Sequence, residues 1–200
     1  MKQYIIVLLI SFTSINSAKS QFFKNNVIYT TGELNLGNYI GVDLNLNYVT
    51  DHNYSLKIGY TGNIRKPKSQ PENYSSGVSG VFALGFNDPY DQIENYQIGI
   101  GKIYNLNPSG TIRANVSLGL GYTIVTTPQN WQENNDRFFT KNYTWDYNKQ
   151  NTVSLVINPK IEFPLTRFYG LTLSPMIILN KHSSYFGIGI GIVHMIGALR

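Results

Sequence analysis

The chain has no cysteine, so no disulfide framework can hold it together, and a fold that closes its own edges suits it better. Only 14% of its residues are charged, and the basic residues are scattered along the chain. Scattered basic charge argues against a nucleic-acid partner. Beyond the first twenty residues no run of 18 apolar residues occurs, which argues against a transmembrane helix.

The clearest pattern lies in residues 111–125. Its even positions are apolar throughout: Ile112, Ala114, Val116, Leu118, Leu120, Tyr122 and Ile124. Its odd positions are polar or glycine up to Thr123. Ordinary soluble strands have about 5–6 residues, so this longer two-faced strand indicates a wall with hydrocarbon on one side and a polar interior on the other.

The first twenty residues have a different character. Lys2 precedes an apolar run, and Ala18 and Ser20 form the small-x-small pattern of a signal-peptide cleavage site. This pattern predicts a secretory signal peptide at 1–20, cleaved near Gln21, because the run is short of the roughly 20 residues that span a membrane. We expect an N-terminal lead-in at 21–32 and a single barrel domain at 33–200.

Alternation recurs along the mature chain and predicts an all-β fold, an eight-stranded antiparallel transmembrane β-barrel. The strands are expected at 33–50, 54–65, 77–86, 92–106, 111–125, 152–163, 169–180 and 184–196. Residues 33–50 are taken as one strand because a two-residue hairpin at Gly37-Asn38 would reverse the parity. We expect a β-bulge at Pro159, which lacks a ladder donor.

The even strand number places both termini on the periplasmic side. The turns 107–110 and 164–168 then face the periplasm, and 127–151 is an outer loop. The connection 66–76 also falls on the periplasmic side, where it is unusually long.

A soluble barrel of the lipocalin type is the alternative, since alternation alone does not distinguish inside from outside. Two features favour the membrane. The polar face is rich in Gly, Ser, Asn and Thr rather than Lys and Glu, and tyrosines lie near strand ends, where a membrane interface favours them.

The signal sequence, uniform alternation and tyrosine belts resemble those of the small eight-stranded outer-membrane β-barrel proteins of Gram-negative bacteria. The abundance of Asn and Tyr and the exit before Gln21 resemble sequences of the Bacteroidetes. The resemblance covers about residues 33–198 and rests on pattern rather than on a motif. It implies residence in the cell outer membrane, with outer-membrane lipid around the wall.

Charged residues at the polar positions of the alternation should line the lumen. They are Glu33, Asp43, Lys57, Arg65, Arg113, Lys160 and Glu162. They form either a selectivity lining or a salt-bridged filling. The filling is favoured because an eight-stranded barrel is only wide enough for its own side chains, and buried charges must be paired.

The long stretch 127–151 is the best candidate for a binding surface. Its aromatic residues are Trp131, Phe138, Phe139, Tyr143, Trp145 and Tyr147. Aromatics among amide and charged side chains suit a glycan or a protein partner. Alternatively, the segment extends the flanking strands above the membrane and packs on itself.

Support for catalysis is thin. His182-Ser183-Ser184 faintly resembles the His-x-Ser pair of outer-membrane lipid A deacylases, but no Asp or Glu follows Glu162 to orient the histidine. No two histidines stand at ligand spacing, so we expect no metal and no cofactor.

These observations favour a non-enzymatic outer-membrane barrel with a structural or surface-binding role through 127–151. Two alternatives stay open: an accessory subunit of a secretion or uptake complex, and a lipid-modifying enzyme of the lipid A deacylase type.

Overall fold

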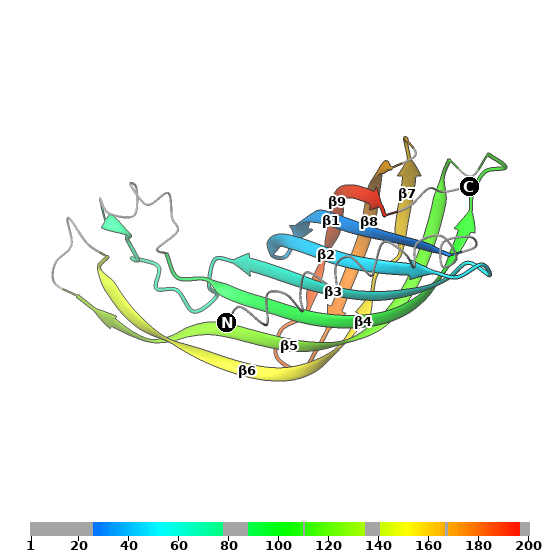
Figure 1. Ribbon diagram of the computed structural model, residues 1–200. Coiled ribbons are helices and arrows are strands. Elements are labelled where there is room, and N and C mark those ends of the chain that lie inside the picture. The colour runs from blue at the N-terminus through cyan, green and yellow to red at the C-terminus, as the bar shows by residue number, and fades with distance from the viewer. Residues whose placement is uncertain (1–25, 78–87, 110, 135–140, 167, 197–200) are drawn as a thin grey trace, which may run out of the picture.

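The computed structural model describes residues 26–77, 88–109, 111–134, 141–166 and 168–196. These residues form one antiparallel sheet that closes on itself: the first strand, β1, pairs with β2 on one side and with the last strand, β9, on the other (Figure 1). Its strands are β1 Val27–Gly37, β2 Ile40–Val49, β3 Tyr54–Arg65, β4 Asp91–Asn105, β5 Arg113–Glu133, β6 Tyr143–Ile157, β7 Lys160–Pro164, β8 Tyr169–Leu179 and β9 Tyr185–Met195.

The segments β6 and β7 form one strand of the barrel. Leu118 pairs with Ile157 and Arg113 pairs with Glu162, so the register against β5 is the same on both sides of Pro159. The barrel therefore has eight strands within the described residues. The expected β-bulge at Pro159 is wrong, because the proline interrupts the ladder without adding a residue to it.

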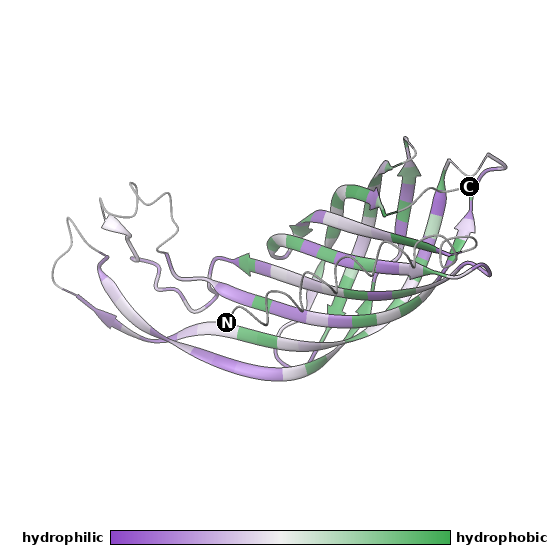
Figure 2. Cartoon of the chain, in the orientation of Figure 1, coloured by the Kyte–Doolittle hydropathy of each residue, from purple (hydrophilic) through white to green (hydrophobic). Residues whose placement is uncertain are grey.

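The outer face of the barrel is apolar and the inner face is polar. Leu34, Ile98 and Val153 are 65%, 65% and 67% exposed, whereas Asn35, Asn63 and Asn95 are fully buried. Figure 2 shows the alternation along the barrel strands. This is the reverse of a soluble barrel, in which the apolar residues would lie inside. The chain is a transmembrane β-barrel. No helix in the described ranges is long and apolar enough to cross a membrane.

The first hairpin corrects the prediction of one strand at 33–50. β1 and β2 are separate, and Leu36 pairs with Ile40. Three residues lie between these partners, and an odd number of loop residues preserves the parity of the alternation. The pattern therefore runs through the turn unchanged. β1 also begins at Val27, within the stretch expected to be a lead-in.

The strand expected at 77–86 has no place between its neighbours in the ring, because β3 pairs directly with β4, from Tyr54 with Lys102 to Arg65 with Asp91. Residues 78–87 themselves lie outside the described residues. The strand number was thus correct for compensating reasons: one expected strand is two, and β3 pairs with β4 where a further strand was expected between them.

These two corrections also change the sides on which the connections lie. The short connections 50–53, 106–112 and 165–168 lie at the end where β1 begins and β9 ends. The long connection between β3 and β4 lies at the opposite end, together with the one between β5 and β6. The prediction that 66–76 shares a side with the termini is therefore wrong.

Glycines on the inner face make room for polar side chains. A Cβ on Gly121 would lie 2.0 Å from the Asn95 Oδ1, and one on Gly189 would lie 2.7 Å from the Glu33 Oε2. A narrow barrel can hold large polar side chains only where the facing positions are empty. The abundance of glycine in the strands follows from this packing.

Leu118→Arg tests the assignment of the outer face. Leu118 is 51% exposed near the middle of the apolar band, so a charge there should cost about 2–4 kcal/mol of unfolding free energy. Urea titration in lipid vesicles, followed by heat-modifiable gel migration, measures it. Leu118→Met is the matched control and should stay within about 1.5 kcal/mol of wild type. Equal stability of both variants would mean that the face is not in hydrocarbon.

Candidate functional site: a packed lumen and an external aromatic hairpin

Two regions carry the predicted site residues: the interior of the barrel and the hairpin that projects from it. Inside, Lys160 forms the central ion pair. Its Nζ lies 2.6 Å from the Glu33 Oε1 and 3.3 Å from the Asp43 Oδ2. The three side chains are at most 1% exposed. One ammonium thus holds two carboxylates from β1 and β2.

Neutral donors complete the shell of both carboxylates. Thr172 Oγ1 donates to Glu33 at 3.1 Å, and the Ser174 hydroxyl donates to the same carboxylate. Asp43 accepts from Thr61 Oγ1 at 2.7 Å and from Gln97 Nε2 at 3.1 Å. Buried charges are tolerated when they are both paired and hydrogen-bonded, and this pair of carboxylates meets both conditions.

A second pair lies nearer the end where the termini enter. Arg113 Nη2 lies 2.6 Å from the Glu162 Oε2, and the Tyr29 hydroxyl donates to Glu162 Oε1 at 2.7 Å. Asn115 Nδ2 donates to the Tyr29 oxygen at 2.9 Å. Lys57 has different partners, since its Nζ donates to Asn158 Oδ1 at 3.0 Å.

Arg65 is separate from this central network. It pairs at 2.9 Å with Asp91, its cross-strand partner, and its guanidinium lies 4.1 Å from the ring centre of Tyr39. Asp91 lies outside the strands expected at 77–86 and 92–106, so this partner was missed. The pairing of β3 with β4 identifies it.

Apolar clusters lie toward the two ends of the polar network. One contains Tyr39, Ile93, Val156, Met176, Ile178 and Tyr185, and the other contains Tyr29, Val49, Ile103, Val193 and Met195. Every member is at most 6% exposed. The lumen is therefore packed with side chains along its length in the described residues.

The segment 127–151 is a paired hairpin rather than an unpatterned loop. β5 continues to Glu133, and β6 begins at Tyr143, so both strands extend beyond the wall, as Figure 1 shows at the left. Figure 2 shows that this extension is largely polar. Phe138 and Phe139 fall outside the described residues.

The hairpin contains one bulge. Gln129 pairs with Asp146, but Gln132 pairs with Thr144, so β5 has two residues opposite the single residue Trp145. Asn130 takes a positive φ of 55°, which asparagine tolerates better than most residues. Trp131 therefore lies opposite Trp145, on the same face of the hairpin, whereas in the unbroken register it would pair with Thr144.

Four rings form the aromatic cluster: Tyr74, Trp131, Tyr143 and Trp145. The two indoles are 5.4 Å apart between ring centres, and Tyr74 lies 6.0 Å from Trp131 and 6.1 Å from Trp145. Tyr143 lies 6.3 Å from Trp131. Tyr147 is outside the cluster and lies 5.6 Å from Tyr90.

The connection between β3 and β4 is tied to the hairpin by hydrogen bonds. Trp131 Nε1 donates to Ser69 Oγ at 3.3 Å, and Ser69 Oγ donates to the Pro128 carbonyl at 2.9 Å. The Tyr143 hydroxyl donates to Asn73 Oδ1 at 2.8 Å. Residues 66–76 show no alternation in the sequence, so the participation of Tyr74 was missed.

Tyr74 itself is held in place by Asp88. Its hydroxyl donates to the Asp88 Oδ1 at 3.1 Å. Burial, together with this hydrogen bond and the negative charge of Asp88, raises the pKa of Tyr74 well above its ordinary value. The phenol is therefore neutral and donating at neutral pH.

His182, Ser183 and Ser184 lie in the turn between β8 and β9. The backbone N–H groups of His182 and Ser183 donate to Asn180 Oδ1 at 2.9 and 2.8 Å. Ser183 Oγ lies 2.6 Å from the Tyr39 hydroxyl. Among the described residues no three histidine or carboxylate side chains gather as a metal site would need.

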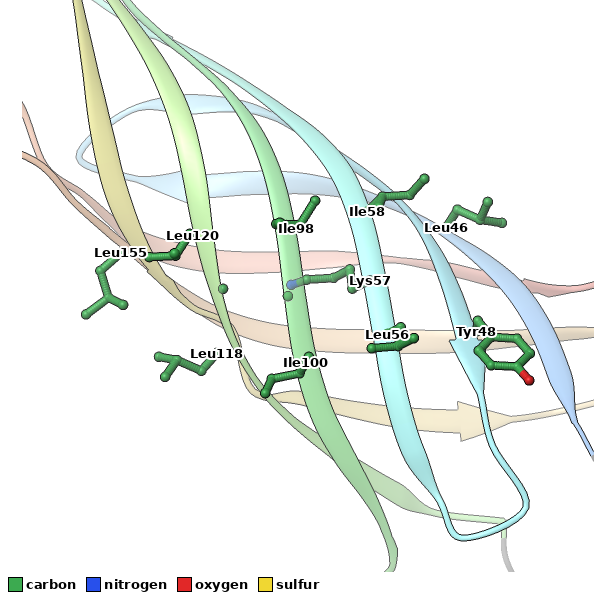
Figure 3. A pocket seen from close by; sticks show the side chains of 12 residues that line it. Leu46, Tyr48, Leu56, Lys57, Ile58, Ile98, Ile100, Leu118, Leu120 and Leu155 are labelled. Atoms are coloured by element: carbon green, nitrogen blue, oxygen red, sulfur yellow. The ribbon is translucent and has the colours of Figure 1, made fainter.

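A groove lined by apolar side chains opens on the outer face of β2–β6 (Figure 3). Leu56, Ile98 and Leu118 are among its lining, and each is more than half exposed. It belongs to the outer surface of the wall, not to the lumen.

Comparison with known proteins gives structural neighbours only. No family model matches the chain, and no curated protein sequence matches it. The N-terminal β-barrel domain of Pseudomonas aeruginosa OprF is 12% identical with a TM-score of 0.48, covering 86% of this chain and 97% of that one. Yersinia pestis Ail in a phospholipid nanodisc is also 12% identical, with a TM-score of 0.48 and coverages of 86% and 99%. Neisserial surface protein A is 9% identical, with a TM-score of 0.47 and coverages of 84% and 94%. Similarity at this level says nothing about what the chain binds.

Lys160→Met tests the central ion pair. It leaves the carboxylates of Glu33 and Asp43 buried without their ammonium, so unfolding free energy should fall by about 3–5 kcal/mol. Urea titration in lipid vesicles measures the loss. The double variant Lys160→Met/Glu33→Gln removes one of the two charges and should recover part of it. A loss below about 1 kcal/mol in the single variant would mean that the pair is not a structural requirement.

Trp131→Ala tests the aromatic cluster. It removes the ring that contacts Tyr74, Tyr143 and Trp145, so the hairpin should open more often and trypsin should cut at Lys141 and Lys149 several-fold faster. Heat-modifiable migration of the barrel should not change. Tyr147→Ala, outside the cluster, is the control. Equal cleavage rates for the two variants would show that the cluster does not hold the hairpin.

Proposed function

We propose that the protein is an outer-membrane β-barrel whose wall anchors an external recognition hairpin. The observation that carries this proposal is the extension of β5 and β6 beyond their neighbours. β5 pairs with β4 only as far as Thr126, and β6 pairs with β8 only from Leu155. The residues beyond these points are not needed to close the wall, yet they carry the aromatic cluster.

The outer membrane is the proposed location. The outer face is apolar around the ring, and Tyr60, Tyr96 and Tyr122 stand at one level on neighbouring strands, the latter two about half exposed. Outer-membrane barrels have short periplasmic turns and long external loops. With this rule, 50–53, 106–112 and 165–168 face the periplasm, and the aromatic cluster faces outward. Lipid acyl chains then cover the groove of Figure 3.

The packed lumen supports a structural or binding role over transport. Polar and apolar side chains fill it, and its central charges are paired with one another. We propose that these charges stabilise the barrel as a salt-bridged filling and do not select ions.

The proposed partner is a glycan or a protein at the hairpin. Aromatic rings beside amide groups such as Asn73 and Asn142 suit either. Export by a cleaved signal peptide at 1–20, a Bacteroidetes-like origin and a role as an accessory subunit remain expectations from the sequence. No contact in the His182–Ser184 turn favours the deacylase alternative.

Replacing residues 128–147 by Asn-Gly tests the proposal. Thr127 pairs with Asn148, so a two-residue turn can join them, and the variant should keep its heat-modifiable migration. Protease added to intact cells should cut the wild-type protein within the hairpin, and these cuts should be absent from the variant. On glycan and peptide arrays, binding by the purified wild-type protein should be lost in the variant. Neither protein should produce step currents in planar bilayers.

Three results would contradict the proposal. The first is a hairpin protected on intact cells and cut only after the periplasm is opened. The second is equal array binding by both proteins. The third is a wild-type barrel with open-channel currents.

A further inference from the structure

The β6 strand has one paired edge and one open edge. On the β8 side only Leu155, Val156 and Ile157 have partners, with Leu179, Ile178 and Ile177. From Thr144 to Ser154, β6 pairs with β5 and with no other strand among the described residues. Among the described residues, a strand edge of about ten residues is thus left without a neighbour.

The direction of the backbone groups on this edge follows from the ladder. Asn158 N–H donates to the Ser117 carbonyl at 3.1 Å, so even-numbered residues of this strand face β5. In an antiparallel sheet both backbone groups of a residue point to the same side, and successive residues alternate. Trp145, Tyr147, Lys149 and Asn151 therefore direct their N–H and C=O groups to the open edge.

The other edge of the same hairpin is closed. Pro128 has no N–H, its carbonyl accepts from Ser69, and the bulge at Asn130 breaks the spacing. Proline, bulges and covering segments are the means by which proteins block strand edges. β6 contains no proline and no bulge between Tyr143 and Ile157. Because one edge of the hairpin is protected and the other is not, the unprotected edge is available for pairing with another strand.

We infer that the open edge of β6 binds an extended segment of another protein as an additional strand. This inference rests on the proposed function, for it names the class of partner that the hairpin takes. Donor and acceptor groups repeat on the edge at every second residue, about 6.8 Å apart. Another strand matches that repeat, whereas a glycan or a lipid does not.

The side chains along the open edge indicate which residues the partner should carry. Lys149 is exposed, and opposite charges on directly facing residues stabilise antiparallel pairs. Tyr147, 40% exposed, stands two residues away on the same face. The partner is therefore an extended segment with an acidic residue opposite Lys149 and an apolar or aromatic residue two positions away.

A display library of linear 12-residue peptides, selected on the full-length protein refolded in detergent, supplies the probe. Lys149→Pro removes one edge-facing N–H and leaves the ladder with β5 intact, since proline is tolerated where the N–H faces outward. It should weaken the binding of the selected peptides by about tenfold or more. Lys149→Ala keeps the N–H and is the matched control, with a loss of only a few-fold. Bound peptide should slow amide exchange at 145, 147, 149 and 151, with little change at the even-numbered residues between them.

Four outcomes overturn the inference. They are enrichment of no peptide, equal binding by Lys149→Pro and wild type, protection confined to the aromatic cluster, and a wild-type dimer that Lys149→Pro dissociates, which would make the occupant a second copy. Failure here is separable from failure of the proposed function. If Lys149→Pro still binds array ligands that the hairpin replacement loses, the hairpin recognises its partner through the aromatic cluster and not through the edge.

Discussion

Every backbone N–H and C=O within a hydrocarbon layer must find its partner inside the protein, because lipid offers none. Closure of the sheet through the pairing of β1 with β9 satisfies this requirement, and much else follows from it. A closed ring of eight strands is narrow, so its interior holds side chains rather than water. The exterior must be apolar and the interior polar, and the glycines are the spaces into which the larger polar groups fit.

The same constraint explains the pairing of charges in the lumen. Charges at the inward-facing positions have no bulk solvent, so each needs a polar partner inside the barrel. Arg113 finds Glu162 on the adjacent strand segment, whereas Lys160 reaches across the lumen to Glu33 and Asp43. The contacts of Lys160 join β7 to β1 and β2. They therefore act as a cross-link of the barrel interior.

The sequence alone predicted the inner and outer residues well, because parity is a property of each strand by itself. It predicted β3 at its observed bounds, Tyr54–Arg65. It failed at Gly37–Tyr39, where a loop with an odd number of residues keeps the parity and hides the hairpin. It also could not pair charges on different strands, since Arg65 finds Asp91 only when β3 lies beside β4. Tyr74 was missed for the same reason: its place depends on two long connections meeting at one end.

The bulge at Asn130 has a consequence for how the external surface is encoded. Parity fixes which aromatic residues can share a face, and one extra residue in β5 changes that parity for everything beyond it. If the register of residues 113–129 continued unbroken, Trp131 would pair with Thr144 and lie on the side of the hairpin opposite Trp145. The shared aromatic face therefore depends on the bulged register as much as on composition. A chain that keeps these aromatic residues but restores the unbroken register would present a different surface to the outside.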